Sequence, residues 1–190
     1  MVVNPYKKFV FVSIAKCAST SIRRRLGYFN DPPPEEYHMF LKDILLLHPY
    51  AVDYFKFAFV RNPYDRLYST YINLKHDGHD WATAIKKRKS FKDCVMNLEG
   101  SEYSKYIHLQ PQAAYITVDE EIAVDYLGRF ENLKQDFFDI ESVLGLSHVA
   151  LAKERYSRKV PEDPKIYDEE MKEVVRRFYK EDFERFGYDK

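Results

Sequence analysis

Two short segments of this chain place basic and hydroxyl side chains where an apolar stretch gives way to a helical pattern. The first covers residues 13–21 and reads SIAKCASTS. The second begins at Arg61, directly after the apolar residues 54–60, and includes Ser69. Cations, hydroxyl donors and the backbone N–H groups of a helix N-terminus together favour a bound anion. The two segments therefore predict two sites for phosphate-like groups.

Lys16 supplies a mobile cation in the first segment, and Thr20 and Ser21 add hydroxyl donors. The loop is not the triphosphate motif GxxxxGK[ST], because it has no glycine and Cys17 stands where the metal-coordinating hydroxyl would be. An ordinary strand-to-helix turn, with a solvent-facing lysine and Ser19 as N-cap, is the alternative for this loop taken alone. The segment indicates an anion site without the metal ligands of an ATP enzyme.

Arg61 ends the second apolar stretch, and Asn62-Pro63 then favours a helix start, since Asn is a good N-cap and Pro suits the first helical position. Ser69 follows about 9 Å along that helix at a rise of ~1.5 Å per residue. An arginine and a hydroxyl at this separation could hold one phosphate from two sides. Taken alone, Arg61 could equally be a salt-bridge partner and Ser69 a routine helix serine.

Strand and helix patterns alternate along the first 75 residues, which is typical of an α/β fold. The expected strands cover residues 8–14, 54–60, 114–118 and 126–130. The expected helices cover residues 19–28, 39–47 and 63–74. Two further helices are expected, one after a capping box formed by Asn132 and Gln135 and one through residues 171–179. We expect a three-layer α/β/α domain with a central, mostly parallel sheet, as a single domain over residues 1–190. Both anion segments then follow the carboxyl ends of parallel strands, where ligands of such sheets bind.

Composition excludes several classes of protein. The 30 basic and 30 acidic residues balance, so general binding of nucleic acid is disfavoured. The two cysteines, Cys17 and Cys94, lack a zinc-like spacing and indicate reduced thiols and a cytoplasmic setting. No apolar run approaches the ~18 residues of a transmembrane helix, and the first residues lack a signal-like apolar run.

The two segments together resemble the donor-binding motifs of sulfotransferases that use 3′-phosphoadenosine 5′-phosphosulfate (PAPS). Residues 15–21 are similar to the 5′-phosphosulfate loop of that family, and residues 60–71 to its 3′-phosphate segment. The similarity is closest to the carbohydrate (family 2-like) branch and continues through residues 108–112, 128–133 and 182–188. That branch often has Pro and Gly where this chain has Ala15 and Ala18. The resemblance implies a P-loop-like fold.

The resemblance also implies the reaction, which moves a sulfuryl group from PAPS to an acceptor hydroxyl and releases 3′-phosphoadenosine 5′-phosphate (PAP). Lys16 would contact the bridging oxygen and stabilise the departing phosphate. The other donor contacts implied are Cys17, Ala18, Ser19, Thr20 and Ser21 at the 5′-phosphate, and Arg61 and Ser69 at the 3′-phosphate. Such transfer needs alignment and charge stabilisation, and the sulfuryl group carries less charge than a phosphoryl group, so no metal is expected.

A general base must take the proton of the acceptor hydroxyl, and the resemblance favours His38. Its ordinary pKa suits neutral pH. Glu35 and Glu36 are alternatives, because other branches of the family use a glutamate in this region. A surface histidine in a loop is the plain structural interpretation.

Two further arginines are candidates for the donor site. Arg129 could brace the donor or pair with Glu131, and the sequence does not favour either. Arg158 lies in a polar loop before the last helix, where a lid over the nucleotide is expected.

The acceptor implied is a hydroxyl on a carbohydrate or glycoconjugate. Two other functions stay open at this point. One is an ATP-dependent small-molecule kinase of the P-loop type, which predicts dependence on magnesium. The other is a nonenzymatic nucleotide- or glycan-binding module, which predicts that changes at Lys16 and His38 are harmless.

Overall fold

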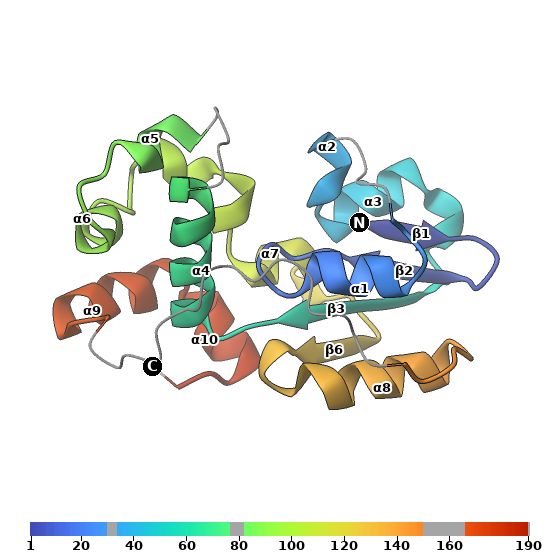
Figure 1. Ribbon diagram of the computed structural model, residues 1–190. Coiled ribbons are helices and arrows are strands. Elements are labelled where there is room, and N and C mark those ends of the chain that lie inside the picture. Colours follow the sequence, from blue (N-terminus) through green and yellow to red (C-terminus); the bar gives the residue numbers. More distant parts are fainter. Residues whose placement is uncertain (30–33, 77–81, 150–165, 190) are drawn as a thin grey trace. The chain divides into compact units, whose positions relative to one another are not determined.

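The computed structural model describes residues 1–29, 34–76, 82–149 and 166–189, with the backbone alone at 34 and 35 (Figure 1). Its contacts divide the chain into two compact units, each of which is described by itself. The first comprises Met1–Arg61 and Gln112–Arg155, and the second Asn62–Pro111 and Tyr156–Lys190. A single domain over residues 1–190 stays a prediction.

A four-stranded sheet in the order β1-β2-β3-β6 forms the centre of the first unit. The strands are β1 (Val2–Asn4), β2 (Phe9–Val12), β3 (Phe55–Val60) and β6 (Tyr126–Arg129). Strands β2, β3 and β6 are parallel, and β1 pairs antiparallel with β2. The predicted mostly parallel sheet is confirmed. The edge strand β1 was not predicted, because three residues are too few to show an alternating pattern.

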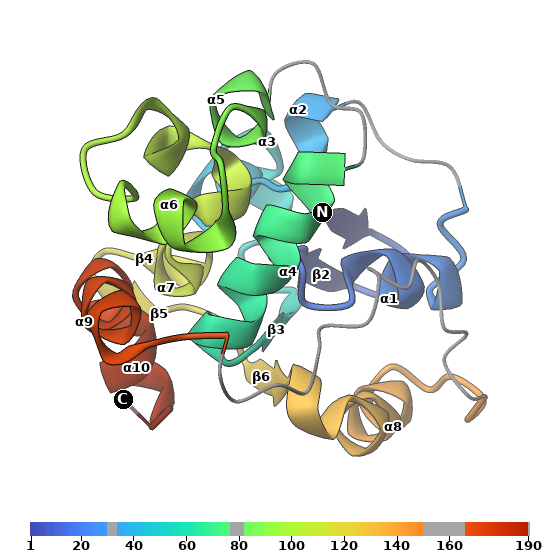
Figure 2. The same ribbon diagram turned by 60° about the vertical axis from the view of Figure 1, so that its left-hand side comes forward.

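Helices cover both faces of this sheet. The helical segments of the first unit are α1 (Ser19–Arg25), α2 (Pro34–Tyr37), α3 (Leu41–Leu47), η1 (Pro49–Ala51), α7 (Gln112–Ile116), η5 (Phe130–Asn132) and α8 (Leu133–Val143). Figures 1 and 2 show α1 and α8 on one face and α3 and α7 on the other. The three-layer α/β/α arrangement is therefore confirmed. A small hairpin of β4 (Thr117–Val118) and β5 (Glu121–Ile122) follows α7.

Aromatic side chains form the core beside the sheet. All four residues of β2 are buried, as the continuous apolar run predicts for an inner parallel strand. The rings of Phe11 and Phe57 stack across β2 and β3 with centroids 5.1 Å apart. Farther along β3, the Phe59 ring lies against Gly128 of β6, so closely that a Cβ atom there would meet it at 2.4 Å. Gly128 is therefore required by packing.

The second unit is helical. Its elements are α4 (Pro63–His76), α5 (Thr83–Lys86), α6 (Phe91–Met96), η3 (Glu102–Lys105), η4 (Ile107–Leu109), α9 (Glu169–Phe178) and α10 (Lys180–Phe186). The backbone N–H of Tyr64 donates to Asn62 Oδ1 at 3.0 Å, which confirms Asn62 as the cap of α4. The helix predicted over residues 63–74 is also confirmed, and Leu67, Tyr71 and Leu74 lie on its buried face.

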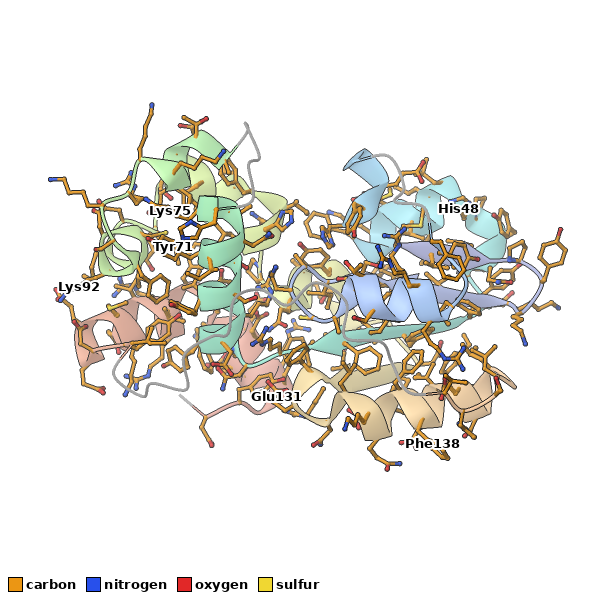
Figure 3. The ribbon with its side chains drawn as sticks, in the orientation of Figure 1. His48, Tyr71, Lys75, Lys92, Glu131 and Phe138 are labelled. Carbon is orange, nitrogen blue, oxygen red and sulfur yellow. The ribbon has the colours of Figure 1, made fainter. Side chains whose placement is uncertain are left out.

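Contacts from α4 organise the rest of this unit. The ammonium group of Lys75, labelled in Figure 3, donates to the carbonyl of Lys86 at 2.9 Å and so holds the end of α5. Tyr71, one turn earlier on α4, packs its ring against Phe91 of α6 with centroids 5.1 Å apart. The Tyr167 hydroxyl donates to the carbonyl of Tyr64 at 2.8 Å, and burial raises the pKa of that hydroxyl well above its usual value.

Two sequence predictions about local structure were wrong. Residues 114–116 are helical in α7, and only Thr117–Val118 forms a strand, because alanine favours helix and Pro111 precedes the helix start. Asn132 makes no side-chain cap, since it ends the η5 turn, and Gln135 donates to Asp139 instead at 3.1 Å. The last predicted helix is confirmed as α9, and a further helix, α10, follows Tyr179 and was not predicted.

Three consecutive arginines in α1, at residues 23–25, favour a cationic outer face, but this interpretation is only partly correct. Arg23 is 3% exposed, and its guanidinium lies over the Tyr37 ring at 4.8 Å from the centroid. A guanidinium can be buried when an aromatic face compensates its charge.

Candidate functional site

The loop between β2 and α1 folds back on its own first residues. The Ser19 hydroxyl donates to the carbonyl of Ile14 at 2.8 Å, and the backbone N–H of Cys17 donates to the same carbonyl at 3.4 Å. Lys16 and Ala18 both adopt left-handed backbone conformations, with φ of 67° and 61°. Such conformations cost a non-glycine residue roughly 1–2 kcal/mol. Glycine at position 18 would avoid this cost.

The backbone amides at the start of α1 suit an anion. Ala18 is the N-cap and has no capping side chain, so helix geometry gives the N–H groups of residues 19–21 no acceptor within the helix. The first turn also contains no acidic residue. Amides of this kind beside left-handed residues form concave anion-binding sites. Ser19 is therefore not the N-cap of the alternative interpretation, because its hydroxyl is used to hold the loop.

The loop also contacts the segment that carries His38. The Thr20 hydroxyl lies 3.2 Å from the Tyr37 hydroxyl. Nδ1 of His38 lies 2.7 Å from the carbonyl oxygen of Ser13, the first residue after β2. A carbonyl can only accept, so Nδ1 carries the proton and Nε2 carries the lone pair of the neutral ring. This tautomer makes Nε2 the nitrogen that can act as a base.

Arg61 lies beside this loop in the first unit. Its guanidinium sits over the ring of Phe130 at 4.2 Å, and Nη1 donates to the carbonyl of Lys16 at 3.4 Å. Its backbone N–H and carbonyl each bond to the side chain of Gln112 at 2.8 Å. The structure thus brings together Lys16 and Arg61, which are 45 residues apart in the sequence.

The other predicted donor residues have different outcomes. Arg129 ends β6 opposite Val60, and its backbone N–H donates to Asp136 at 2.6 Å. Ser69 is 1% exposed in α4 and belongs to the second unit. Arg158 lies outside the described residues.

Of the two alternative bases, the structure describes the side chain of Glu36 alone. Nothing is described of the Glu35 side chain, and the side chain of Glu36 is half-buried. Of the three candidates, His38 has a contact to the start of the donor loop.

Sequence reasoning missed two residues that contact Arg61. Phe130 and Gln112 both lie in segments similar to the sulfotransferases, but no residue pattern marks them as its neighbours. Burial is the feature that distinguishes Gln112, and burial is not visible in the sequence.

The described residues contain no group of three or more His, Cys, Asp or Glu side chains that could hold a metal. Both cysteines are free thiols, as the sequence predicts. Both are also buried, and burial raises the pKa of Cys94 to about 11. Within the described ranges, no helix has both the length and the apolar character needed to cross a membrane.

Comparison with known proteins identifies the family. The family model described as the sulfotransferase family matches residues 1–189. The chain belongs to the sulfotransferase family. Searches of curated proteins and of solved structures gave no match. The family assignment makes this protein a sulfotransferase, an enzyme that transfers a sulfuryl group, and its α/β fold is consistent with that family.

Proposed function

We propose that this sulfotransferase takes its sulfuryl group from PAPS and transfers it to a hydroxyl of a carbohydrate or glycoconjugate. The observation that carries the proposal is the meeting of Lys16 and Arg61, joined by the 3.4 Å hydrogen bond from Nη1 to the Lys16 carbonyl. Two cationic residues that follow the carboxyl ends of adjacent parallel strands suit a ligand with separate phosphate groups. PAPS carries such groups on its 5′ and 3′ positions.

The loop at Lys16 would hold the 5′-phosphosulfate. Backbone amides from Cys17 through Ser21, with the hydroxyls of Thr20 and Ser21, would bind the phosphate oxygens. The Lys16 ammonium would stabilise the negative charge that develops on the bridging oxygen as the S–O bond breaks. Because these amides are held before the ligand arrives, little reorganisation is needed during transfer.

The 3′-phosphate would be bound by Arg61, whose guanidinium is oriented by Phe130. A bidentate contact from this fork would distinguish PAPS from nucleotides that lack a 3′-phosphate. Ser69, Arg129 and Arg158 are proposed as further donor contacts from their match to the family motifs and their place in the sequence.

His38 would act as the general base through Nε2. The acceptor oxygen forms a bond to sulfur as the bond from sulfur to the bridging oxygen breaks, and the acceptor proton passes to Nε2. The hydrogen bond from Nδ1–H to Ser13 orients the ring and stabilises the imidazolium that forms. Glu36 is the rival base.

Calorimetry with PAP and ADP tests the donor. We expect PAP to bind more tightly by roughly 10- to 100-fold, because a hydrogen bond to a charged group contributes about 1.5–3 kcal/mol. Equal or tighter ADP binding would contradict the PAPS donor and favour a kinase-like site. The same titration with a chelator present tests our expectation that no metal is needed.

Transfer of labelled sulfate from PAPS to a panel of mono- and oligosaccharides tests the acceptor. His38→Ala should abolish turnover while PAP affinity stays near that of the wild type, since His38 acts on the acceptor. His48→Ala is the matched control, because the hydrogen bond described for the His48 side chain is local, to the Tyr50 hydroxyl at 2.9 Å. Full turnover in His38→Ala, together with loss of turnover in Glu36→Gln, would identify Glu36 as the general base. A cytoplasmic location stays a prediction.

A further inference from the structure

The side chain of Gln112 connects the two donor-binding segments, and the proposed chemistry gives it no role. It is 0% exposed at the start of α7. Its Oε1 accepts from the backbone N–H of Arg61 at 2.8 Å, and its Nε2 donates to the carbonyl of Arg61 at 2.8 Å. The Cys17 thiol contacts the same Oε1 at 3.4 Å. One amide thus touches the backbone of Arg61 and a residue of the donor loop.

The orientation of this amide is determined by its partners. The N–H of Arg61 can only donate and its carbonyl can only accept, so Oε1 must face the first and Nε2 the second. A flipped amide would place its NH₂ group against the Arg61 N–H, donor facing donor, and its oxygen against the Arg61 carbonyl, acceptor facing acceptor. Gln112 therefore has one favourable orientation, which the paired bonds to Arg61 hold.

Arg61 needs such a partner because it lies just past the sheet. The ladder between β3 and β6 ends at Val60 opposite Arg129, and the ladder between β2 and β3 ends at Val12 opposite Ala58. A buried backbone N–H and carbonyl without partners are costly. The Gln112 amide supplies both bonds, as a neighbouring strand would, and so fixes the backbone from which the Arg61 side chain extends.

We propose that Gln112 is a positioning residue for recognition of the donor's 3′-phosphate. It acts through Arg61, whose guanidinium reaches over Phe130 toward the Lys16 carbonyl, and through Cys17 in the donor loop. The inference rests on the proposed PAPS donor and deepens it. A free backbone at Arg61 would let the guanidinium shift, and a displacement on the order of 1 Å is enough to lose much of a directional contact.

Gln112→Met tests the inference, because methionine has similar length and neither amide hydrogen-bonding group. We expect the Kd for PAP to rise roughly 10- to 100-fold, as misplacement of a binding group does, while the Kd for ADP, which shares the loop but lacks the 3′-phosphate, rises by less. The KM for PAPS should rise with a smaller change in kcat. A merely structural glutamine would lower thermal stability but leave the ratio of the ADP and PAP dissociation constants unchanged.

Gln110→Met is the matched control. Gln110 has the same side chain two positions earlier, and its Nε2 donates to the carbonyl of Ser104 at 2.9 Å in the second unit. This variant loses a side-chain-to-backbone hydrogen bond of the same kind and should keep the wild-type ratio of the two dissociation constants.

Gln112→Glu provides a second test should Gln112→Met fail to fold. A protonated carboxyl group can accept from the Arg61 N–H and donate to its carbonyl, as the amide does, whereas the ionised carboxylate cannot donate. Burial favours the protonated form. PAP affinity relative to wild type should therefore recover as the pH is lowered from 8 to about 5.5 and fall again as the pH rises. A ratio to wild type that does not vary with pH would overturn the proposal.

Hydrogen exchange of the ligand-free protein separates this inference from the proposed donor. Gln112→Met should speed exchange in peptides that cover Arg61 and residues 15–21, and Gln110→Met should not. Wild-type protein that binds no PAP would refute the donor, while the exchange result still decides whether Gln112 holds these segments. Unchanged exchange, or an unchanged ratio of the two dissociation constants, would refute the role of Gln112.

Discussion

The two strand-to-helix transitions of the proposed donor site are built differently. Between β2 and α1 lie residues 13–18, of which Lys16 and Ala18 are left-handed, and α1 has no side-chain cap. Between β3 and α4 lie only Arg61 and Asn62, and the Asn62 side chain caps α4 by accepting from the Tyr64 N–H. The first transition leaves helix amides without a capping side chain, whereas the second satisfies one of them.

This difference indicates how the two segments would recognise phosphate. The loop at Lys16 offers a concave set of backbone amides and one mobile cation, so the main chain would do most of the proposed binding. The segment at Arg61 offers a guanidinium on a backbone that Gln112 holds, so a side chain would do most of the proposed binding. Backbone recognition tolerates changes of side chain at most loop positions, and side-chain recognition does not.

Among the substitutions that test this comparison, Lys16→Ala should have the largest effect on activity. We expect turnover to fall by roughly 10²- to 10³-fold with the fold preserved, because one donor to developing charge is removed. Initial rates with saturating labelled PAPS and a responsive acceptor measure this change.

Lys8→Ala is the matched control for Lys16→Ala. Lys8 also has a left-handed backbone, with φ of 52°, but it is exposed in the turn between β1 and β2. Its variant should retain full activity. Equal rates for the two variants would mean that the Lys16 side chain takes no part in transfer.

Arg61→Lys should have the next largest effect. Lysine keeps the charge but loses the planar fork and its stacking on Phe130, so PAP affinity should fall by roughly 10-fold or more while ADP affinity changes little. Calorimetry with both nucleotides measures the two effects. Arg177→Lys, at an exposed ion pair with Glu99 in the second unit, serves as the control. An equal loss of affinity for PAP and ADP would show that Arg61 does not recognise the 3′-phosphate.

Asn62→Ala tests the side-chain cap of the second transition. We expect a loss of about 1 kcal/mol in the free energy of unfolding, because an N-cap hydrogen bond is removed. Urea denaturation measures the loss. Asn132→Ala is the control, since Asn132 occupies the N-cap position of α8 without a side-chain cap and should have little effect. Similar losses in both variants would show that the cap is not the cause.

Ala18→Gly should have the smallest effect, and in the opposite direction. Glycine removes the left-handed cost at φ 61° but adds conformational entropy to the unfolded chain, which leaves a net gain of about 0.5 kcal/mol. Urea denaturation again measures the change, and PAP affinity should stay near wild type. Ala15→Gly, next to Lys16 without a positive φ, should instead destabilise the protein. A loss of stability in both variants would contradict the strain assigned to Ala18.

Much of the fold could be predicted because its signals are local. The buried runs that became β2 and β3 are continuous and apolar, and the start of α4 is marked by adjacent capping residues. The predictions that failed depended on competition between neighbours. The sequence around Asn132 is typical of a helix cap, but Asn132 is the last residue of the η5 turn. Residues 114–116 have the composition of a strand, but they are part of the helix α7.

The candidate site divides in the same way. The sequence by itself determined the family, the three parallel strands of the sheet and the two segments rich in anion-binding groups, since these are encoded by residue types at short spacing. Only the tertiary structure decided that His38 meets Ser13 across 25 residues and that Gln112 pairs with Arg61 across 51. Single buried hydrogen bonds depend on where distant segments meet, and one side chain leaves no periodic pattern in the sequence that would predict that meeting.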